Sequence, residues 1–185
     1  MNPQIAELLQ MDVLNLGCGH KHLSGAINLD ITTATSPDIT HNLNVRPWPF
    51  PDSHFREVHA YDVLEHVDDV VAVMEEIHRI CRPEALVRIT VPHFSCRNAY
   101  VDPTHRHFFS CDSFRYFTSG DDLAFYTEAR FRIVSNRIFF YPSLLNKLIW
   151  RLANHWPETY EQRWAWIFPA WFLQFDLEVS KPAES

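Results

Sequence analysis

The sequence is poor in residues that could cross-link a fold. It has four widely spaced cysteines, and no two of them form a C-x-x-C pair. A disulfide framework is therefore not expected, and reduced thiols in the cytoplasm are the simplest interpretation. The first residues contain neither a basic lead nor a long apolar segment, so the sequence predicts no secretory signal. No apolar run is long enough to predict a transmembrane segment.

The sequence also lacks an excess of positive charge. It has 23 acidic residues against 16 lysines and arginines, which gives a net charge of −7. A nucleic-acid-binding protein is expected to carry a basic stripe, so we expect no nucleic-acid partner. No internal repeat or low-complexity segment interrupts the 185 residues, of which 46% are hydrophobic. This composition is ordinary for a globular protein, and we expect residues 1–185 to form a single domain.

Glycine is scarce as well, yet two of the four glycines lie next to a predicted strand. The apolar run 13–16 ends in Gly17-Cys18-Gly19, and a second apolar run, 26–29, ends on Asp30. Strand, glycine turn, strand and acid form a nucleoside pocket at the carboxyl edge of a parallel sheet. The glycines allow a tight turn and close contact with a ligand, and Asp30 would accept hydrogen bonds from a ribose diol.

A third glycine is missing from this turn. A dinucleotide site has the pattern G-x-G-x-x-G with a helix N-terminus at the pyrophosphate, but His22 occupies the third position here. The short distance between Gly19 and Asp30 leaves little room for a long helix. The turn therefore favours a nucleoside without phosphates, and a nicotinamide oxidoreductase is the least favoured function.

The remaining pattern predicts a Rossmann-like, doubly wound α/β fold with a mostly parallel, seven-stranded sheet. Apolar residues at intervals of three or four predict a helix over 67–80. Strands are expected at 12–16, 26–30, 38–42, 57–61, 86–91, 131–140 and 173–179. Residues 11–92 would then form one half of the domain, and residues 93–185 the other.

Several motifs in the first half resemble one enzyme family. LNLGCG followed by NLD, and later YDVLEHV followed by EEIHRICRPEALVRITVP, are similar to motifs of the class I S-adenosylmethionine-dependent methyltransferases. The compact spacing is similar to that of short bacterial members in which the first helix is reduced. The resemblance implies S-adenosylmethionine as the cofactor and one antiparallel strand near the end of the chain. It also implies methyl transfer to an unidentified small-molecule or saccharide-type acceptor.

The same resemblance implies which residues contact the donor. Asn42 would meet the adenine amine and Leu43 would pack on the ring, while Tyr61 and Asp62 follow the fourth strand. The family often has an acid where this chain has Asn15. The complete predicted donor-binding set is Asn15, Gly17, Cys18, Gly19, Asp30, Asn42, Leu43, Tyr61 and Asp62.

Residues 93–109 form a long segment rich in histidine, arginine and aromatic residues, and a loop of this length is usually functional. We expect it to form the acceptor side of the site. Methyl transfer depends mainly on positioning, and a base helps only where the acceptor must lose a proton. His93, His105 and His107 are the candidate bases, and Asp102 would orient one of them or bind an acceptor hydroxyl.

Two further properties of this loop bear on its ligand. Arg97 and Arg106 are opposed only by Asp102, which motivates the expectation of an acceptor with a carboxylate or phosphate. A zinc site at His105-x-His107 with Cys96 and Cys111 has suitable ligand types, but its spacing matches no known pattern, so no metal is expected.

The segment 141–170 reads as a helical insertion rich in tryptophan, placed before the last strand. A lid or core cover is the preferred interpretation, with a dimer surface or peripheral membrane contact as alternatives. A non-catalytic, methyltransferase-like binding subunit that retains or has lost the nucleoside pocket is the alternative function. The sequence determines neither the acceptor and its attacked atom nor the oligomeric state.

Overall fold

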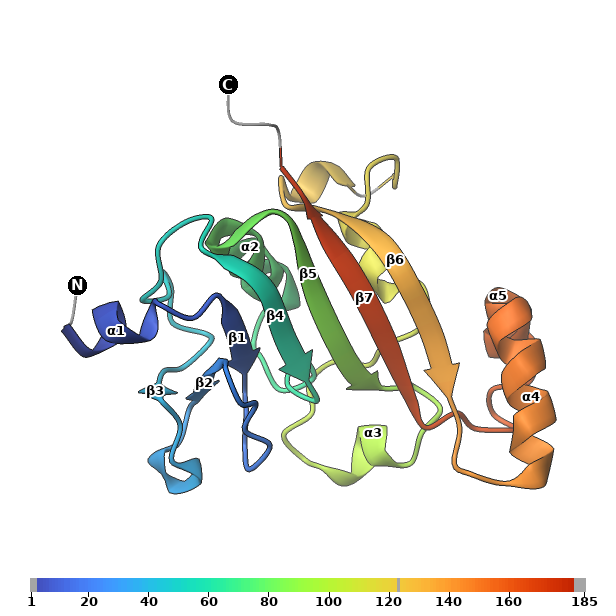
Figure 1. The fold of residues 1–185 in the computed structure, drawn as a ribbon. Helices are drawn as coiled ribbons and strands as arrows, with labels where there is room; N and C mark the ends of the chain where they lie inside the picture. The colour runs from blue at the N-terminus through green and yellow to red at the C-terminus, as the bar shows by residue number, and fades with distance from the viewer. Residues whose placement is uncertain (1–2, 123, 182–185) are drawn as a thin grey trace.

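Seven strands form one sheet in the order β3-β2-β1-β4-β5-β7-β6 (Figure 1). The structure is a computed structural model that describes residues 3–122 and 124–181. The strands are β1 (Val13–Leu16), β2 (Ile27–Asp30), β3 (Ile39–Thr40), β4 (Phe55–Tyr61), β5 (Cys81–Pro92), β6 (Arg130–Phe139) and β7 (Phe172–Ser180). The helices are α1 (Pro3–Leu8), α2 (Val70–Ile80), α3 (Asn98–Val101), α4 (Leu144–His155) and α5 (Pro157–Arg163), with short 3-10 helices η1 (Thr33–Thr35), η2 (Ser113–Phe117) and η3 (Ala124–Tyr126).

The strand directions confirm the predicted topology. Strands β1 to β5 pair in parallel, and β7 runs antiparallel to both β5 and β6. The helical segment that contains α4 and α5 joins β6 to β7, as the sequence predicted. Because the strand order reverses between β1 and β4, the connections after these two strands leave in opposite directions. A crevice at the carboxyl ends of the strands is expected at such a point.

The connection from β1 to β2 contains no helix between residues 17 and 26. This agrees with the expectation that the short spacing leaves little room for a long helix. The turn is closed instead by the hydrogen bond from Cys18 N to Leu29 O, at 3.0 Å. The segment that follows β1 therefore stays close to the end of β2, where Asp30 lies.

Helix α2 begins and ends where its sequence directs it. Asp69 caps its N-terminus, since its side chain accepts a hydrogen bond from Ala72 N at 3.0 Å. Its apolar face is buried against the sheet through Met74, Ile77 and Ile80. The chain then enters β5 directly at Cys81, earlier than the predicted residue 86, and pairs with Phe55 before a register shift near Glu57.

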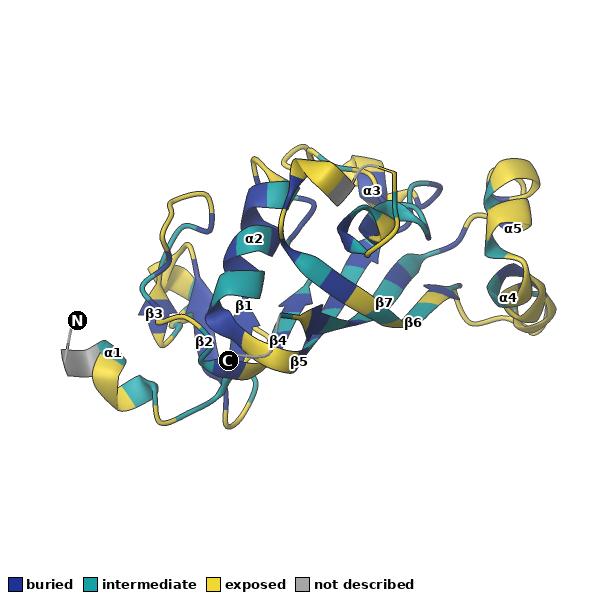
Figure 2. Ribbon diagram, turned by 90° about the horizontal axis from the view of Figure 1, so that it is seen from above, coloured by how far each residue is buried: buried dark blue, intermediate teal, exposed yellow. Residues whose placement is uncertain are grey.

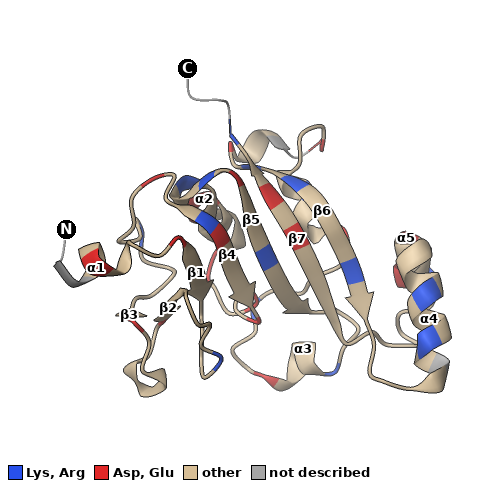
Figure 3. Cartoon of the chain, in the orientation of Figure 1, with Lys and Arg blue, Asp and Glu red and all other residues tan. Residues whose placement is uncertain are grey.

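The two faces of the sheet differ. Helix α2 and the 3-10 helix η2 pack on one face, where Phe114 contacts Phe175 with ring centroids 4.6 Å apart. No helix of the described residues covers the other face of the central strands (Figure 2). That face carries charged residues of both signs on neighbouring strands (Figure 3). Arg88 Nε lies 2.8 Å from Glu57 Oε1, and Arg132 Nη2 lies 2.6 Å from Glu178 Oε2.

Helices α4 and α5 lie beside β6 at the edge of the sheet (Figures 1 and 2). Ile149, Ala153 and Tyr160 are buried and join the hydrophobic core. The side chain of Asn154 pairs with the backbone of Ile138 through two hydrogen bonds of 2.9 and 2.8 Å. The insertion therefore covers the edge of the core, in agreement with one part of the predicted role.

Candidate functional site

One cleft follows the carboxyl ends of β1, β2, β4 and β5. It consists of three adjoining pockets of about 480, 190 and 540 Å³, and Asp62 lines all three. The 480 and 190 Å³ pockets lie around Asp30 and the glycine turn, and we call them the Asp30 end. The 540 Å³ pocket is lined by Glu65, His66 and His105, and we call it the Glu65 end.

Asp30 lies at the last position of β2 and is held by backbone amides. Gly19 N donates a hydrogen bond to Oδ2 at 2.8 Å, and Thr32 N donates one to Oδ1 at 3.1 Å. The residue is 8% exposed and lines the 480 Å³ pocket. Each carboxylate oxygen has a second lone pair, so the carboxylate can accept further hydrogen bonds from a ligand in the cleft.

The glycine turn brings the backbone against the cleft. Gly17 has a φ of +58°, and a Cβ built on it would lie 2.4 Å from Val63 Cγ2. No side chain fits there without displacing Val63. Gly19 has a φ of +49°, but a Cβ at this position would meet nothing within 4 Å. Glycine is therefore required at position 17 by both conformation and space, and at position 19 by conformation alone.

Asn15, which lies in β1, stabilises this turn through its side chain. It is 2% exposed, and its Nδ2 donates hydrogen bonds to Lys21 O at 2.9 Å and to Asn28 Oδ1 at 3.0 Å. Asn28 continues the network, since its Nδ2 donates to Asp38 Oδ2 at 3.0 Å. The amide of Asn15 is used as a donor in both bonds, and a carboxylate could make neither of them.

Cys18 lies between the two glycines with its side chain buried. Burial raises the pKa of its thiol above the ordinary value, and the nearby charge of Asp30 acts in the same direction. The side chain is therefore a neutral, apolar part of the wall at neutral pH. Cys18 lines the 190 Å³ pocket together with Asn15, Gly17, Gly19, Tyr61 and Asp62.

Asn42 and Leu43 lie next to Asp30 in the cleft, as the resemblance implied. Both line the 480 Å³ pocket. Asn42 Oδ1 accepts a hydrogen bond from Asn44 N at 3.0 Å, and Trp48 Nε1 donates to Leu43 O at 3.0 Å. These contacts hold a partly buried amide and a buried apolar side chain on the wall that faces Asp30.

Asp62 follows β4 at the junction of the three pockets. It has a φ of +55°, a left-handed conformation that is uncommon for residues other than glycine, asparagine and aspartate. Its carboxylate accepts a hydrogen bond from Thr90 Oγ1 at 3.1 Å and lies 3.4 Å from Lys21 Nζ. The preceding Tyr61 lines the 190 Å³ pocket, and its hydroxyl lies 2.7 Å from His59 Nδ1.

Glu65 is a carboxyl group buried at the opposite end of the cleft. It is 1% exposed, and its Oε2 has no hydrogen-bond partner among the described residues. Burial raises the pKa of this carboxyl to about 8. His105 Nε2 lies 4.0 Å from Glu65 Oε1, and the rings of His66 and His105 meet edge to face at 4.6 Å. A carboxyl group and two imidazoles thus share one pocket.

Asp102 acts on this cluster through Thr104. The Thr104 hydroxyl donates to Asp102 Oδ1 at 2.6 Å and lies 2.8 Å from His66 Nδ1. These bonds to Thr104 lower the pKa of Asp102. Asp102 was expected to orient a histidine of its own loop, whereas the structure connects it to His66, which follows β4.

The structure does not bring the other two candidate bases to the cleft. His93 is fully buried, with Nδ1 accepting from Ser95 N at 3.1 Å and Nε2 lying 3.1 Å from Glu161 Oε1. His107 Nε2 lies 2.9 Å from Val67 O. The ring nitrogens of His93 connect the end of β5 to α5, so we assign it a structural role.

The zinc ligands considered from the sequence do not gather either. Cys111 Sγ donates to Glu161 Oε2 at 3.1 Å, and Cys96 Sγ accepts from Asn98 N at 3.3 Å. Of that set, only His105 belongs to a described cluster of three potential metal ligands, and its companions there are Glu65 and His66.

Sequence reasoning missed Glu65, His66 and Trp171 as lining residues of the site. A signal for the first two was present, because they lie in the segment that follows the predicted strand 57–61, at the carboxyl edge of the sheet. Trp171 offered no such signal. It reaches the cleft because β7 pairs antiparallel with β5, which places residue 171 beside the end of β5.

The arginines of the loop do not make the cleft basic. Arg106 Nη1 pairs with Asp68, and neither Arg97 nor Arg106 lines the described pockets. The charged residues that line the Glu65 end are Asp62, Glu65, Asp102 and Lys21. The structure thus removes the observation that motivated an anionic acceptor.

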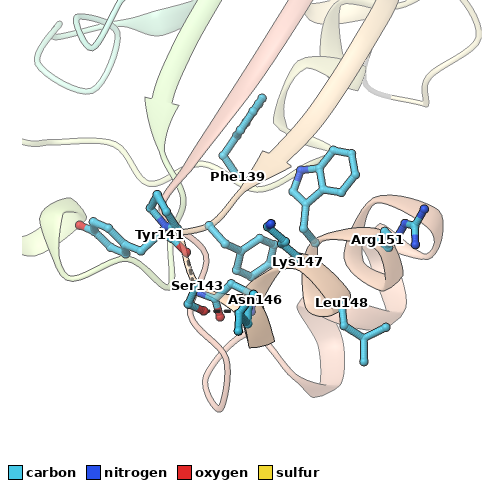
Figure 4. Close-up of a pocket in the computed structure, with 11 residues that line it drawn as sticks. Phe139, Tyr141, Ser143, Asn146, Lys147, Leu148 and Arg151 are labelled. Atoms are coloured by element: carbon cyan, nitrogen blue, oxygen red, sulfur yellow. Dashed lines mark hydrogen bonds between the residues drawn. The ribbon is translucent and has the colours of Figure 1, made fainter.

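A separate pocket of about 570 Å³ lies where β6 leads into α4 (Figure 4). Ser143 caps α4 by accepting from Asn146 N at 3.0 Å. None of the residues that line this pocket lines the cleft, so α4 is not a lid over it.

The insertion exposes large apolar side chains, among them Leu144, Leu148, Trp156, Trp164, Trp166 and Ile167. Peripheral membrane contact stays a prediction, and no described helix has the length and apolar character needed to span a bilayer.

Comparison with solved structures shows the same fold in S-adenosylmethionine-dependent methyltransferases. One from Archaeoglobus fulgidus is 15% identical, with a TM-score of 0.63 over 94% of this chain and 89% of that chain. One from Mesorhizobium loti is 14% identical, with a TM-score of 0.58 over 96% of this chain and 98% of that chain. Phosphoethanolamine N-methyltransferase 2 from Haemonchus contortus, solved with S-adenosyl-L-methionine, is 15% identical, with a TM-score of 0.55 over 98% of this chain and 53% of that one.

A search of curated protein sequences found no match. A family model described as a methyltransferase domain matches residues 3–133, which is more than half of the chain. The match includes every residue of the cleft except Trp171 and Phe172. The chain therefore belongs to the methyltransferase domain family.

Proposed function

We propose that this methyltransferase uses S-adenosylmethionine and transfers its methyl group to a small, neutral, polar acceptor. The observation that carries the proposal is the position of Asp30. Its carboxylate lies at the end of β2, is held by two backbone amides and lines a cleft of about 480 Å³ next to the glycine turn. This is the arrangement that binds the ribose of a nucleoside at the switch point of a parallel sheet.

The residues of the Asp30 end fit this cofactor. The ribose diol would donate to the free lone pairs of Asp30, and Asn42 and Leu43 offer a polar and an apolar contact to the adenine. The backbone at Gly17 comes close to the ligand because no Cβ intervenes. Tyr61 and Asp62 line the smaller pocket together with the glycine turn, and the methionine part would lie there.

S-adenosylmethionine supplies an electrophilic methyl group when bound. The contribution of the chain is to hold an acceptor in line with that group, an effect that can lower the barrier by about 7–11 kcal/mol. The acceptor would enter at the Glu65 end, where Val101, Trp171 and Phe172 provide apolar walls. His66 and His105 are the groups there that can receive an acceptor proton.

The acidic lining argues against an anionic acceptor. Three carboxyl groups and one lysine line the Glu65 end, and an anion would be repelled by Asp62 and Asp102. A pocket of about 540 Å³ is in the range that holds small molecules. A hydroxyl or amine on such a molecule would reach the cluster of Glu65 and the two histidines.

The test is the affinity for S-adenosylhomocysteine, measured by calorimetry on the wild type and on Asp30→Asn. We expect Asp30→Asn to bind about 10–100-fold more weakly, because charge-assisted hydrogen bonds contribute about 1.5–3 kcal/mol. Asp52→Asn is the matched control, since Asp52 is exposed and pairs with Arg79 outside the cleft. Equal affinity of wild type and Asp30→Asn, or no binding by the wild type, would contradict the proposal. Binding without transfer of a labelled methyl group to any acceptor would favour a non-catalytic binding subunit.

A further inference from the structure

Glu65, His66 and His105 meet at one place in the cleft, although a single base would suffice for a proton transfer. One potential ligand atom from each of the three residues lies within 4.8 Å of the other two. Glu65 Oε1 and His105 Nε2 are 4.0 Å apart. Ligand atoms about 2.0–2.2 Å from a tetrahedral ion lie about 3.3–3.6 Å apart, so small movements of these side chains would bring their atoms to binding distance. We propose that these three side chains bind a divalent transition-metal ion, such as Zn²⁺, at the Glu65 end of the cleft.

The carboxyl group of Glu65 provides an independent observation. It is 1% exposed, it lines the pocket, and its Oε2 has no hydrogen-bond partner in the described part of the chain. A buried carboxyl oxygen without a partner is costly, and most such atoms in folded proteins are satisfied. A cation bound between Glu65 and the two histidines would supply the missing partner.

Contacts behind the cluster hold the two imidazoles as a metal site requires. His105 Nδ1 lies 3.2 Å from Ala99 O, and a carbonyl can only accept, so Nδ1 carries the proton and Nε2 presents its lone pair on the side of Glu65. The chain from His66 through Thr104 to Asp102 fixes the second ring. Hydrogen bonds from a ligating histidine to a carbonyl or a carboxylate are typical of metal sites and orient the ring.

The donor set indicates which ions fit. Two imidazoles and one carboxylate suit zinc, iron(II) and related ions, whereas magnesium and calcium prefer oxygen ligands. Asp62 and Asp102 line the same pocket and add negative charge that favours a cation. Three protein ligands also leave coordination positions open, as in catalytic rather than structural sites.

An ion at this place would define the acceptor more closely, and this step rests on the proposed function. It would bind a hydroxyl oxygen of the acceptor and lower the pKa of that hydroxyl. The hydroxyl proton leaves to water, the oxygen forms a bond to the methyl carbon, and the bond from that carbon to sulfur breaks. The products are a methyl ether and S-adenosylhomocysteine, and no electron is gained or lost. The acceptor class is therefore an alcohol or phenol.

The experiment measures Zn²⁺ binding by calorimetry on protein first treated with a chelator, without donor or acceptor. We expect one Zn²⁺ per chain, and a loss of affinity of more than about 100-fold in Glu65→Gln and in His105→Gln, which exceeds the effect of removing an outer-shell partner. His107→Gln is the matched control, because this histidine belongs to the same loop and bonds to Val67 O but lines none of the three pockets of the cleft. It should bind like the wild type.

A second measurement keeps the test decisive if the variants do not fold. Co²⁺ added to the wild-type protein should give the strong visible absorption of a four- or five-coordinate site, and Zn²⁺ should abolish it. Absence of this absorption, or equal Zn²⁺ affinity in Glu65→Gln, His105→Gln and the wild type, would overturn the metal site. Affinity for S-adenosylhomocysteine separates the two proposals. If the protein binds S-adenosylhomocysteine but not Zn²⁺, only the metal site is refuted. If it binds Zn²⁺ but not S-adenosylhomocysteine, only the donor site is refuted.

Discussion

The two ends of the cleft are built in opposite ways. At the Asp30 end, the polar groups of the glycine turn and β2 lie close together in the sequence and satisfy one another, as Asn15 does with Lys21 O and Asn28. At the Glu65 end, the lining residues come from five separate segments between Lys21 and Phe172, and Glu65 Oε2 has no partner among the described residues. The polar groups of the first end are thus satisfied within the chain, whereas the second end has a buried carboxyl oxygen that no described residue satisfies.

The segments at the Glu65 end need an anchor, because the loop that carries Asp102 and His105 contains only the short helix α3. The side chain of Glu161 in α5 provides this anchor. Its Oε1 lies 3.1 Å from His93 Nε2 and accepts from Cys111 N at 2.6 Å, so it joins α5 to both ends of the loop. The Asp30 end needs no such anchor, because the hydrogen bond from Cys18 N to Leu29 O holds the glycine turn against β2.

The largest effect is expected from His93→Ala. This change leaves a cavity and removes the hydrogen bonds to Ser95 and Glu161, so the free energy of unfolding should fall by about 3–4 kcal/mol. Denaturation with urea measures it. Affinity for S-adenosylhomocysteine should stay close to that of the wild type, because the Asp30 end is not touched. His105→Ala, which truncates a side chain at the cleft wall, should cost about 1 kcal/mol. An equal cost in both variants would remove the distinction between an anchoring and a cleft-lining histidine.

A smaller effect is expected from Asn15→Asp, which introduces the acid that the family resemblance implies at this position. A carboxylate cannot donate to Lys21 O or Asn28 Oδ1, so the turn should lose about 1–3 kcal/mol and the affinity for S-adenosylhomocysteine should fall. Asn44→Asp is the control, because Asn44 uses its side-chain oxygen to accept from Asp68 N, and a carboxylate can do the same. That variant should change stability by less than about 0.5 kcal/mol. Higher affinity in Asn15→Asp would show that charge matters more than the turn.

The smallest effect concerns the pKa of Cys18. Burial and the charge of Asp30 both raise the pKa of this thiol, so its alkylation by iodoacetamide should begin only above the pH at which an ordinary thiol reacts. Because the folded-state pKa is raised, this group contributes stability below the ordinary thiol pKa, and that contribution is lost as the pH rises through the folded-state value. Asp30→Asn should move the alkylation profile to lower pH. Mass spectrometry assigns the reaction to Cys18, and an unchanged profile would show that the two side chains do not interact.

Much of the fold could be predicted from local pattern. The apolar run before Gly17, the helix that Asp69 caps and the strand that contains Val87 and Ile89 each have the periodicity of their structure. The boundaries were less accurate, since β5 begins at Cys81 and β3 covers only Ile39–Thr40. The ends of strands depend on pairing with neighbours, which a single stretch of sequence does not specify.

The candidate site divides in the same way. Gly17, Gly19, Asp30, Asn42 and Leu43 were predicted together and line one end of the cleft. Among the four acceptor-side candidates, Asp102 and His105 line the cleft, while His93 and His107 do not. The sequence of a loop without hydrophobic periodicity does not indicate toward which side its histidine side chains point. Their places were decided by which neighbours satisfied them, as Glu161 does for His93.

By itself, the sequence determined the positions of the seven strands, the helix before β5 and the Asp30 end, because apolar periodicity, glycine conformation and the acid at the end of β2 act over a few residues. Only the tertiary structure decided the Glu65 end. Glu65, His105 and Trp171 lie far apart in the chain, and they meet only because β5 pairs with both β4 and the antiparallel β7. The burial of Glu65, whose Oε2 has no partner among the described residues, is likewise a property of the folded chain and not of any one segment.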